Sequence, residues 1–152
     1  MNELPDDVLK EINERLGGYN TAMALRFVRA TLNELVAELE VTERHRQPYG
    51  LVHGGVYTGM IETVCSVGAA LNVLAAGKST VGLDNATSFL RAVRSGVLRC
   101  TARPLVRGRR THVWEGEIHD DRDRLVATGR VRILVLEAGA EADGVEVGIV
   151  PS

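Results

Sequence analysis

The sequence predicts an α+β fold in which one long buried helix is wrapped by a curved antiparallel sheet. Two observations carry this prediction: a long, almost uncharged segment at 54–76, and four strand-like segments that follow it between 79 and 137. Strands that run together, separate from a helix, are typical of α+β domains. We expect residues 1–137 to form a single domain with a short N-terminal helix, and the acidic residues 138–152 to form a tail.

The residues before the long helix predict three shorter elements. Acidic residues in a first turn and glycines after a last turn are typical of a helix, and alternating β-branched residues are typical of strands. The elements are a helix at 5–16 stopped by Gly17-Gly18, a hairpin from 25–31 and 35–41 with its turn at Asn33-Glu34, and a loop at 45–50 (HRQPYG).

The segment 54–76 predicts a buried helix, because it is apolar almost all round and has no proline. Glycines and alanines among its larger apolar residues would let neighbouring backbone approach closely. Gly77 is the expected stop. Glu62 is its only charged residue, and it leaves no uninterrupted apolar run of 18 residues, so we expect no membrane span.

Four antiparallel strands are expected to complete the sheet. They lie at 79–90, 96–106, 110–119 and 125–137, with hairpin links at 93–95, 107–109 and 120–124. In the second strand Leu98, Cys100, Ala102 and Val106 share one face by alternation. A weak late strand is expected at 145–149. A single sheet of this kind leaves open edges, so we expect it to pair with a second copy.

Composition and charge exclude several classes of protein. Aromatic residues make up 4% of the chain and the net charge is −2, which argues against a nucleic-acid-binding protein. The acidic N-terminus does not resemble a signal peptide. Two cysteines, Cys65 and Cys100, form no disulfide framework, so a reduced, cytoplasmic location is expected.

Arginine is concentrated in one segment. Residues 91–110 contain seven arginines and no acid, and arginine suits bidentate phosphate contacts. The cluster fits a small anionic ligand or a solvated strand face. Its members are Arg91, Arg94, Arg99, Arg103, Arg107, Arg109 and Arg110.

The loop that enters the long helix is the sharpest candidate site. Backbone N–H groups at a helix start are unpaired and carry partial positive charge, so they can bind an oxyanion. Gly54 lets a substrate approach that backbone, and the amide of Gln47 can donate to the same oxygen. His53 stands just before the helix, where a histidine is more often a capping or packing residue.

Glu62 is the second candidate. A carboxylate in so apolar a helix must be paired, exposed to a cleft, or raised in pKa. Ser66 lies four residues on, on the same helical face, and could hold the carboxylate or a water molecule.

The sequence pattern resembles that of the hotdog-fold acyl-CoA thioesterases. In this chain the pattern consists of a loop glutamine, Gln47, then the motif His53-Gly54-Gly55, then an acidic residue on the helix, Glu62. The resemblance is to the branch with phenylacetate-pathway, 4-hydroxybenzoyl-CoA and 1,4-dihydroxy-2-naphthoyl-CoA thioesterases. It covers about residues 20–137 and includes two later blocks, VGLDNATSFLRAVRSG (81–96) and GRRTHVWEGEI (108–118). It implies a hotdog fold and hydrolysis of an acyl-CoA with an aryl or medium-chain acyl group.

The resemblance also implies a mechanism. The thioester carbonyl would sit at the Gly54 amide with Gln47 as helper, and Glu62 would attack it directly or act as base for water. Family sites lie between two subunits, with the helical acid facing the loop of the other copy, so a homodimer or homotetramer is implied. Coenzyme A enters only as part of the substrate, and no other cofactor is implied.

Residues in contact with coenzyme A or substrate follow from the same resemblance. Arg91 matches a position that contacts the nucleotide phosphate, and the others fall where substrate, pantetheine or phosphate contacts are made. They are Gly82, Ser88, Arg91, Gly108, Arg109, Arg110 and Thr111. Relatives that act on hydroxylated aroyl groups can place a histidine where this chain has Ser88.

Other functions have less support. The four histidines form no short metal-ligand motif. A glycosidase needs two carboxylates at its site, and the sequence shows no second acid that is expected to be buried. A non-catalytic acyl-CoA binding or sensing module and a hotdog dehydratase or hydratase remain alternatives, although residues 1–24 are short and acidic for an output element. Candidate pocket-lining residues are Tyr57, Met60, Phe89 and Trp114.

Overall fold

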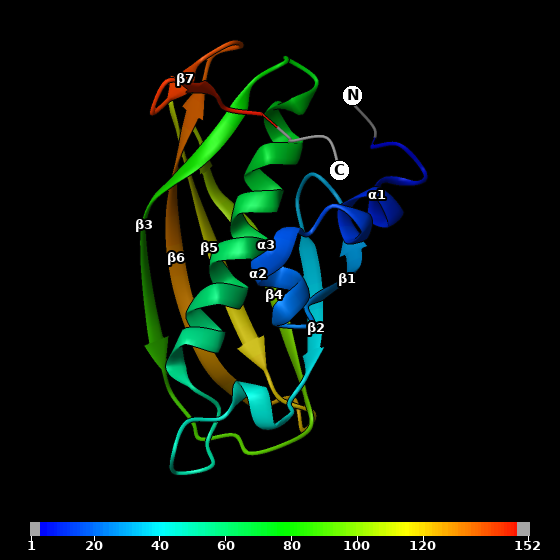
Figure 1. Ribbon diagram of the computed structural model, residues 1–152, viewed down its shortest axis with the longest axis vertical. Helices are drawn as coiled ribbons and strands as arrows, with labels where there is room; N and C mark the ends of the chain where they lie inside the picture. Colours follow the sequence, from blue (N-terminus) through cyan, green and yellow to red (C-terminus); the bar gives the residue numbers. More distant parts are fainter. Residues whose placement is uncertain (1–3, 149–152) are drawn as a thin grey trace.

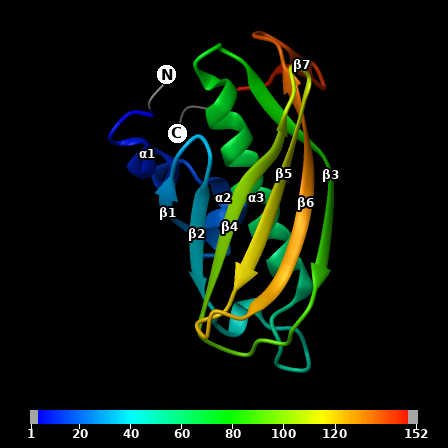
Figure 2. The ribbon, with the colours of Figure 1, turned by 180° about the vertical axis from the view of Figure 1, so that it is seen from behind.

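One six-stranded antiparallel sheet curves around a single long helix, α3 (Gly54–Leu74), as the α+β prediction requires (Figure 1). The computed structural model describes residues 4–148. The strands of the sheet are β1 (Arg26–Ala30), β2 (Leu35–Glu40), β3 (Ser79–Phe89), β4 (Val97–Arg107), β5 (Thr111–His119) and β6 (Leu125–Leu136). Seen from behind, the strands cover one side of α3 (Figure 2).

The strand order is β1-β2-β4-β5-β6-β3. The expected hairpins β1–β2, β4–β5 and β5–β6 are present, but the expected hairpin between β3 and β4 is wrong, because β3 pairs with β6 instead. The segment that joins β3 to β4 runs from Leu90 to Gly96 and is longer than the link expected at 93–95. Seven residues can span roughly 23 Å, enough to cross below the start of α3 to the middle of the sheet.

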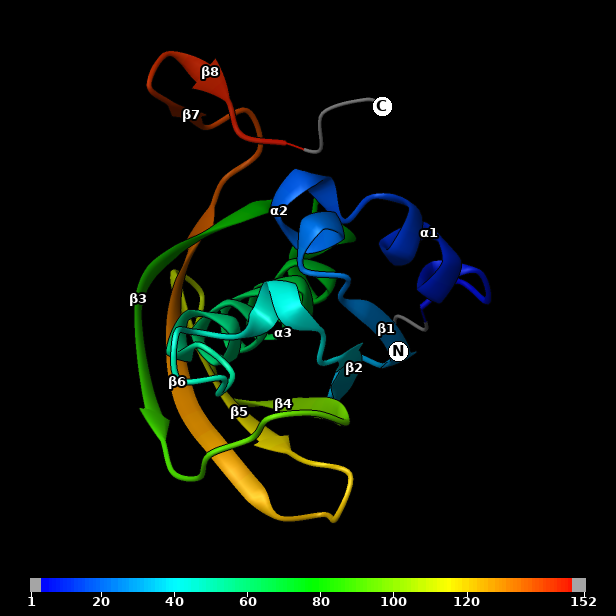
Figure 3. The same cartoon turned by 60° about the horizontal axis from the view of Figure 1, so that its bottom comes forward.

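Helix α3 lies in the hollow of the sheet and forms the centre of the core (Figure 3). Met60, Ile61 and Val64 are fully buried. The expected close approach occurs at Gly68, where an added Cβ would lie 2.5 Å from atoms of Leu35 and Trp114. By length and composition α3 could cross a membrane, in contrast to the sequence expectation. Its packing against the sheet is that of a core helix.

Two helices, rather than the one expected, precede the sheet. The first, α1 (Val8–Glu14), is followed by α2 (Gly17–Ala22). Gly17 does interrupt the first helix, with a φ of 73° that favours glycine, but the chain then resumes a helical path. In α2, Asn20 accepts a hydrogen bond from Thr63 of α3 at 2.7 Å. This helix therefore packs against a short stretch of the side of α3 that the sheet leaves open.

Helix α1 packs on the edge of the sheet that β1 forms. Asn13 of α1 accepts a 2.8 Å hydrogen bond from the Phe27 amide and donates a 2.9 Å bond to the Phe27 carbonyl. A side-chain amide thus occupies a pairing position of β1 that another strand could use. No such side chain covers the outer edge of β3 in the described part of the chain.

Two local expectations are corrected near the end of β4 and the C-terminus. Val106 is 54% exposed rather than on the buried face, because a bulge between Pro104 and Val106 reverses the alternation. Residues 141–146 form a small hairpin of β7 (Glu141–Ala142) and β8 (Val145–Glu146) that projects from the body (Figure 3). The late strand expected at 145–149 is present only at its start, and Ile149 lies outside the described residues.

Candidate active site

His53 caps α3 and leaves the Gly54 amide free. Its backbone is extended, and its Nδ1 accepts a 2.8 Å hydrogen bond from Gly55 N–H. No group in residues 4–148 accepts a hydrogen bond from Gly54 N–H. The capping role considered for His53 is therefore present, and a free donor remains beside it at the positive end of a 21-residue helix.

A tight turn holds Gln47 near this helix start. The Gln47 amide donates to Leu51 O at 2.8 Å, and its carbonyl accepts from Gly50 N–H at 2.9 Å. Gly50 has a φ of 74°, which favours glycine. The side-chain Oε1 accepts from the Tyr49 amide, so the side-chain NH₂ is the group left to donate.

A cavity of about 350 Å³ joins this loop, the start of α3 and the segment after β3. It brings together three predicted site residues, Gln47, Gly54 and Arg91. Its other lining residues are Leu51, Val52, Tyr57, Phe89, Leu90 and Ala92. Of the four candidates for pocket lining, Tyr57 and Phe89 do line it. Met60 and Trp114 do not, because they point into the core and are fully buried.

Tyr57 contributes a neutral phenol. Burial, and to a lesser degree the charge of Asp120, raises the pKa of Tyr57 to about 12. Its hydroxyl is buried with no hydrogen-bond partner among residues 4–148. The tilted rings of Tyr57 and Phe89 have centroids 5.9 Å apart, so the pocket wall is aromatic on this side.

Glu62 lies outside this cavity and is held by hydrogen bonds. It is half-buried, and its Oε2 accepts a 2.9 Å bond from Asn85 Nδ2 on β3. Ser66 Oγ donates to Oε1 at 3.4 Å, which is long for a hydrogen bond. Pairing with polar neighbours, which is one of the states expected for a carboxylate in this helix, is observed.

Glu62 cannot reach the Gly54 amide of its own chain. Eight residues of α-helix rise about 12 Å, and the Glu62 side chain turns toward β3. The carboxylate and the oxyanion donors are therefore two separate half-sites within one copy of the chain.

The residues expected to contact coenzyme A are dispersed in one chain. Ser88 alternates with Phe89 and lies on the sheet face away from α3. The β4–β5 turn is formed by Gly108, Arg109, Arg110 and Thr111. It is closed by a 2.9 Å hydrogen bond from Gly108 N–H to Thr111 O. That turn lies at the opposite end of the molecule from the segment that follows β3 (Figure 1), and Arg91 belongs to this segment. Gly82 lies beside Glu62.

The arginine cluster divides into paired and unpaired members. Arg99 contacts Glu38 at 2.7 Å and Arg103 contacts Glu34 at 2.5 Å. The other side-chain contacts are those of Arg94 with Tyr49 O, and of Arg107 with Asn33 and Asn72. Within residues 4–148, the side chains of Arg91, Arg109 and Arg110 form no hydrogen bond or ion pair. These three are free to meet an anion.

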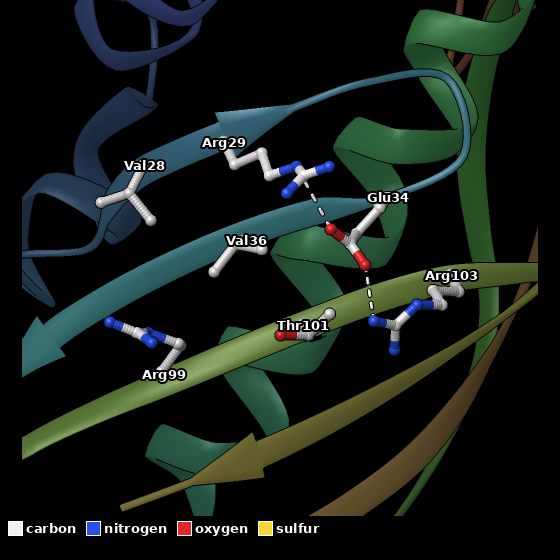
Figure 4. A pocket seen from close by; sticks show the side chains of 7 residues that line it. All are labelled: Val28, Arg29, Glu34, Val36, Arg99, Thr101 and Arg103. Atoms are coloured by element: carbon white, nitrogen blue, oxygen red, sulfur yellow. Dashed lines mark hydrogen bonds and ion pairs between the residues drawn. The ribbon is translucent and has the colours of Figure 1, made fainter. Parts of the chain in front are cut away.

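A second hollow, of about 310 Å³, lies on the outer sheet face over β1, β2 and β4 (Figure 4). Glu34 stands between Arg29 and Arg103 there and contacts both. Arg99 is paired with Glu38, so each arginine that lines this hollow already contacts a carboxylate, in contrast to the free Gly54 amide.

The two cysteines are unsuited to nucleophilic catalysis. Both are buried and free, and burial raises the pKa of the Cys65 and Cys100 thiols well above the ordinary value. In the part of the chain that the structure describes, no group of three His, Cys, Asp or Glu residues is placed to hold a metal ion.

Sequence reasoning missed Asn85 and its neighbour Thr87. Both face α3 from β3, and Thr87 Oγ1 donates to Asn85 Oδ1 at 2.6 Å. The available signal was a pair of polar residues at the helix-facing positions of a strand. The sequence alone does not reveal the bulge between Gly82 and Asp84. Because this bulge shifts the alternation, the helix-facing positions of the strand could not be identified.

Comparison with known proteins places the chain in a family. The sequence profile of the Thioesterase superfamily matches residues 49–127, and the chain belongs to this family. A Mycobacterium tuberculosis protein with a provisional esterase name is 43% identical over 122 residues, which are 79% of this chain and 87% of that protein.

Two further relatives carry more specific names. A 1,4-dihydroxy-2-naphthoyl-CoA hydrolase of Listeria monocytogenes is 31% identical over 118 residues, 78% of this chain and 95% of that protein. A solved thioesterase structure from Haemophilus influenzae superposes with a TM-score of 0.81 at 30% identity, covering 85% of this chain and 90% of that one. The fold is the hotdog fold of thioesterases, and the chain is a thioester hydrolase of that family.

Proposed function

We propose that this protein hydrolyses acyl-CoA thioesters, with an aryl or medium-chain acyl group, to the free acid and coenzyme A. The observation that carries the proposal is the pair of half-sites: a held carboxylate at Glu62, and a free helix-start amide at Gly54 beside Gln47. The CoA thioester named for the Listeria relative supports coenzyme A as the leaving group.

A second copy of the chain would unite the half-sites. Asn13 covers the β1 edge, whereas the β3 edge is open and carries exposed apolar residues such as Leu83 and Phe89. An edge-to-edge, two-fold contact at β3 would run the two strands antiparallel. It would bring Glu62 of one copy toward Gly54 of the other, and the free arginines of the β4–β5 turn toward the Arg91 end of the partner. A homodimer, alone or within a tetramer, is therefore the proposed working form.

In the proposed reaction the thioester oxygen accepts hydrogen bonds from Gly54 N–H and Gln47 NH₂. Glu62 either removes a proton from a water molecule that attacks the carbonyl carbon, or attacks that carbon itself. On either route the C–S bond breaks and the CoA thiolate leaves and takes a proton. On the second route, water then cleaves the mixed anhydride at Glu62. The helix dipole stabilises the oxyanion on both routes.

The test is release of free thiol from a panel of acyl-CoAs by wild-type protein and by the Glu62→Gln variant. The substitution keeps shape and hydrogen bonding but removes the base or nucleophile. We expect kcat to fall roughly 10²- to 10⁴-fold with a much smaller change in KM. Gln47→Ala should cost less, because the Gly54 amide remains. Near-wild-type hydrolysis by folded, dimeric Glu62→Gln would contradict the mechanism. Tight binding without turnover by wild type would favour the alternative of a non-catalytic acyl-CoA binding module.

A further inference from the structure

We propose that Asn85 is a positioning residue that fixes the Glu62 carboxylate and gives its two oxygens different tasks. The inference rests on the proposed thioesterase function and extends it to residues on β3. Asn85 Nδ2 donates to Glu62 Oε2 at 2.9 Å and to the Thr58 carbonyl at 3.3 Å. One amide group thus ties the carboxylate and the backbone of α3 to the same point on the strand.

The orientation of the Asn85 amide is determined by its neighbours. An ionised carboxylate only accepts hydrogen bonds, so the NH₂ of Asn85 must face Glu62 and its oxygen must face away. Thr87 Oγ1 donates to that oxygen at 2.6 Å. The chain of donors from Thr87 through Asn85 to Glu62 therefore runs in one direction, and polarisation along it strengthens the bond to Oε2.

The other carboxylate oxygen is left for the reaction. Among residues 4–148, the one hydrogen-bond contact of Oε1 is the 3.4 Å contact from Ser66. Oε1 lies against Gly82, where an added Cβ would come within 2.6 Å of it. An oxygen without a strong hydrogen bond keeps its lone pairs for a water proton or a carbonyl carbon. We therefore assign Oε2 to anchoring and Oε1 to the reaction, with Gly82 providing the space that Oε1 needs.

A double-mutant cycle with Glu62→Gln tests the proposal, because a positioning residue acts only through the group it holds. We expect Asn85→Ala, and the smaller change Asn85→Ser, to lower kcat roughly 10- to 100-fold with KM changed less than about 3-fold. In the Glu62→Gln background the same changes should have no further effect on kcat.

Conservative and control variants separate positioning from mere stability. Thr87→Ser keeps the hydroxyl and should retain activity, whereas Thr87→Val should lower kcat. Gly82→Ala should lower kcat by displacing Oε1. The matched control is Asn72→Ala, a half-buried asparagine of α3 that donates to Leu32 O at 2.9 Å, away from Glu62. It should lower the melting temperature but leave kcat unchanged.

The proposal would be overturned if Asn85→Ala lowered kcat equally in both backgrounds, changed only KM, or left kcat unchanged. A thermal-shift measurement on each variant confirms that the protein compared is folded. If Glu62→Gln itself kept wild-type activity, the proposed function would fail instead, so the two failures can be told apart.

Discussion

The ring of Phe89 lies against the backbone of Gly54, so closely that a Cβ on Gly54 would sit 2.6 Å from Phe89 Cε2. Phe89 ends the open-edge strand β3, and Gly54 begins α3. The contact joins the aromatic wall of the cavity to the amide that we assign to the oxyanion. It also explains why a residue without a side chain is needed at the first turn of this helix.

Gly54→Ala should therefore impair activity more than stability. The ring is 56% exposed and can turn aside, so the melting temperature should change little, but the added methyl group and the displaced ring would occupy the cavity. We expect kcat/KM to fall at least roughly 10-fold, as for a small misplacement of substrate. The double variant Gly54→Ala/Phe89→Ala, which removes the clash, should recover part of the loss. Equal activities for Gly54→Ala and wild type would show that no substrate approaches this backbone.

The sequence predicted most elements because their signals are local. The long helix ends at Leu74, two residues before its expected bound, and Gly77 has a φ of 69° in the turn that follows. Strands β3, β4, β5 and β6 fall within two residues of their expected bounds. The pairing of β3 with β6 was missed because it depends on where a chain crosses beneath a helix. That Glu62 faces the loop of another copy was implied by the family resemblance, but its bond to Asn85 required the tertiary structure.

Gly68→Ala should destabilise the protein. The new methyl group would overlap Leu35 and Trp114, both fully buried, and neither can move into solvent. Overpacking of a core costs about 1–3 kcal/mol, and the better helix propensity of alanine offsets at most about 1 kcal/mol of that. Chemical denaturation should show a lower free energy of unfolding. A stability at or above that of wild type would mean that α3 packs less closely on the sheet.

Stability should depend on pH through Asp120 in the β5–β6 turn. Hydrogen bonds from the Arg124 side chain, with further backbone amide bonds, lower the pKa of Asp120 to about 2. A lowered folded-state pKa stabilises the protein above the unfolded value of about 3.9, and this contribution is lost as pH falls toward about 2.

The Asp120→Asn variant tests this contribution. We expect it to lose roughly 1–2 kcal/mol near pH 7, a value reduced because Arg124 is partly exposed to water. The difference in the free energy of unfolding between the variant and wild type should shrink as pH falls from about 4 to about 2. A difference that stays constant over that range would show that the carboxylate charge does not contribute.

Arg91 should distinguish nucleotide from pantetheine recognition. Its side chain is exposed and unpaired within residues 4–148, at the mouth of the cavity. We expect Arg91→Ala to raise KM for CoA thioesters more than for short pantetheine thioesters, which lack the nucleotide phosphates. The matched control is Arg103→Ala, because Arg103 is paired with Glu34 on the outer face of the sheet. This variant should leave KM unchanged for both kinds of thioester. Equal effects of Arg91→Ala on both substrates would assign it a structural role.

The central claim is that each active site combines Glu62 of one copy with Gly54 of another. The most direct test mixes two impaired variants, Glu62→Gln and Gly54→Ala, and lets their subunits exchange. Random pairing makes half of the dimers mixed, and each mixed dimer has one site with both groups intact. We predict that thioesterase activity returns to about one quarter of that of an equal amount of wild-type protein. Mixed dimers that form, as shown by their mass, yet gain no activity would contradict the shared site.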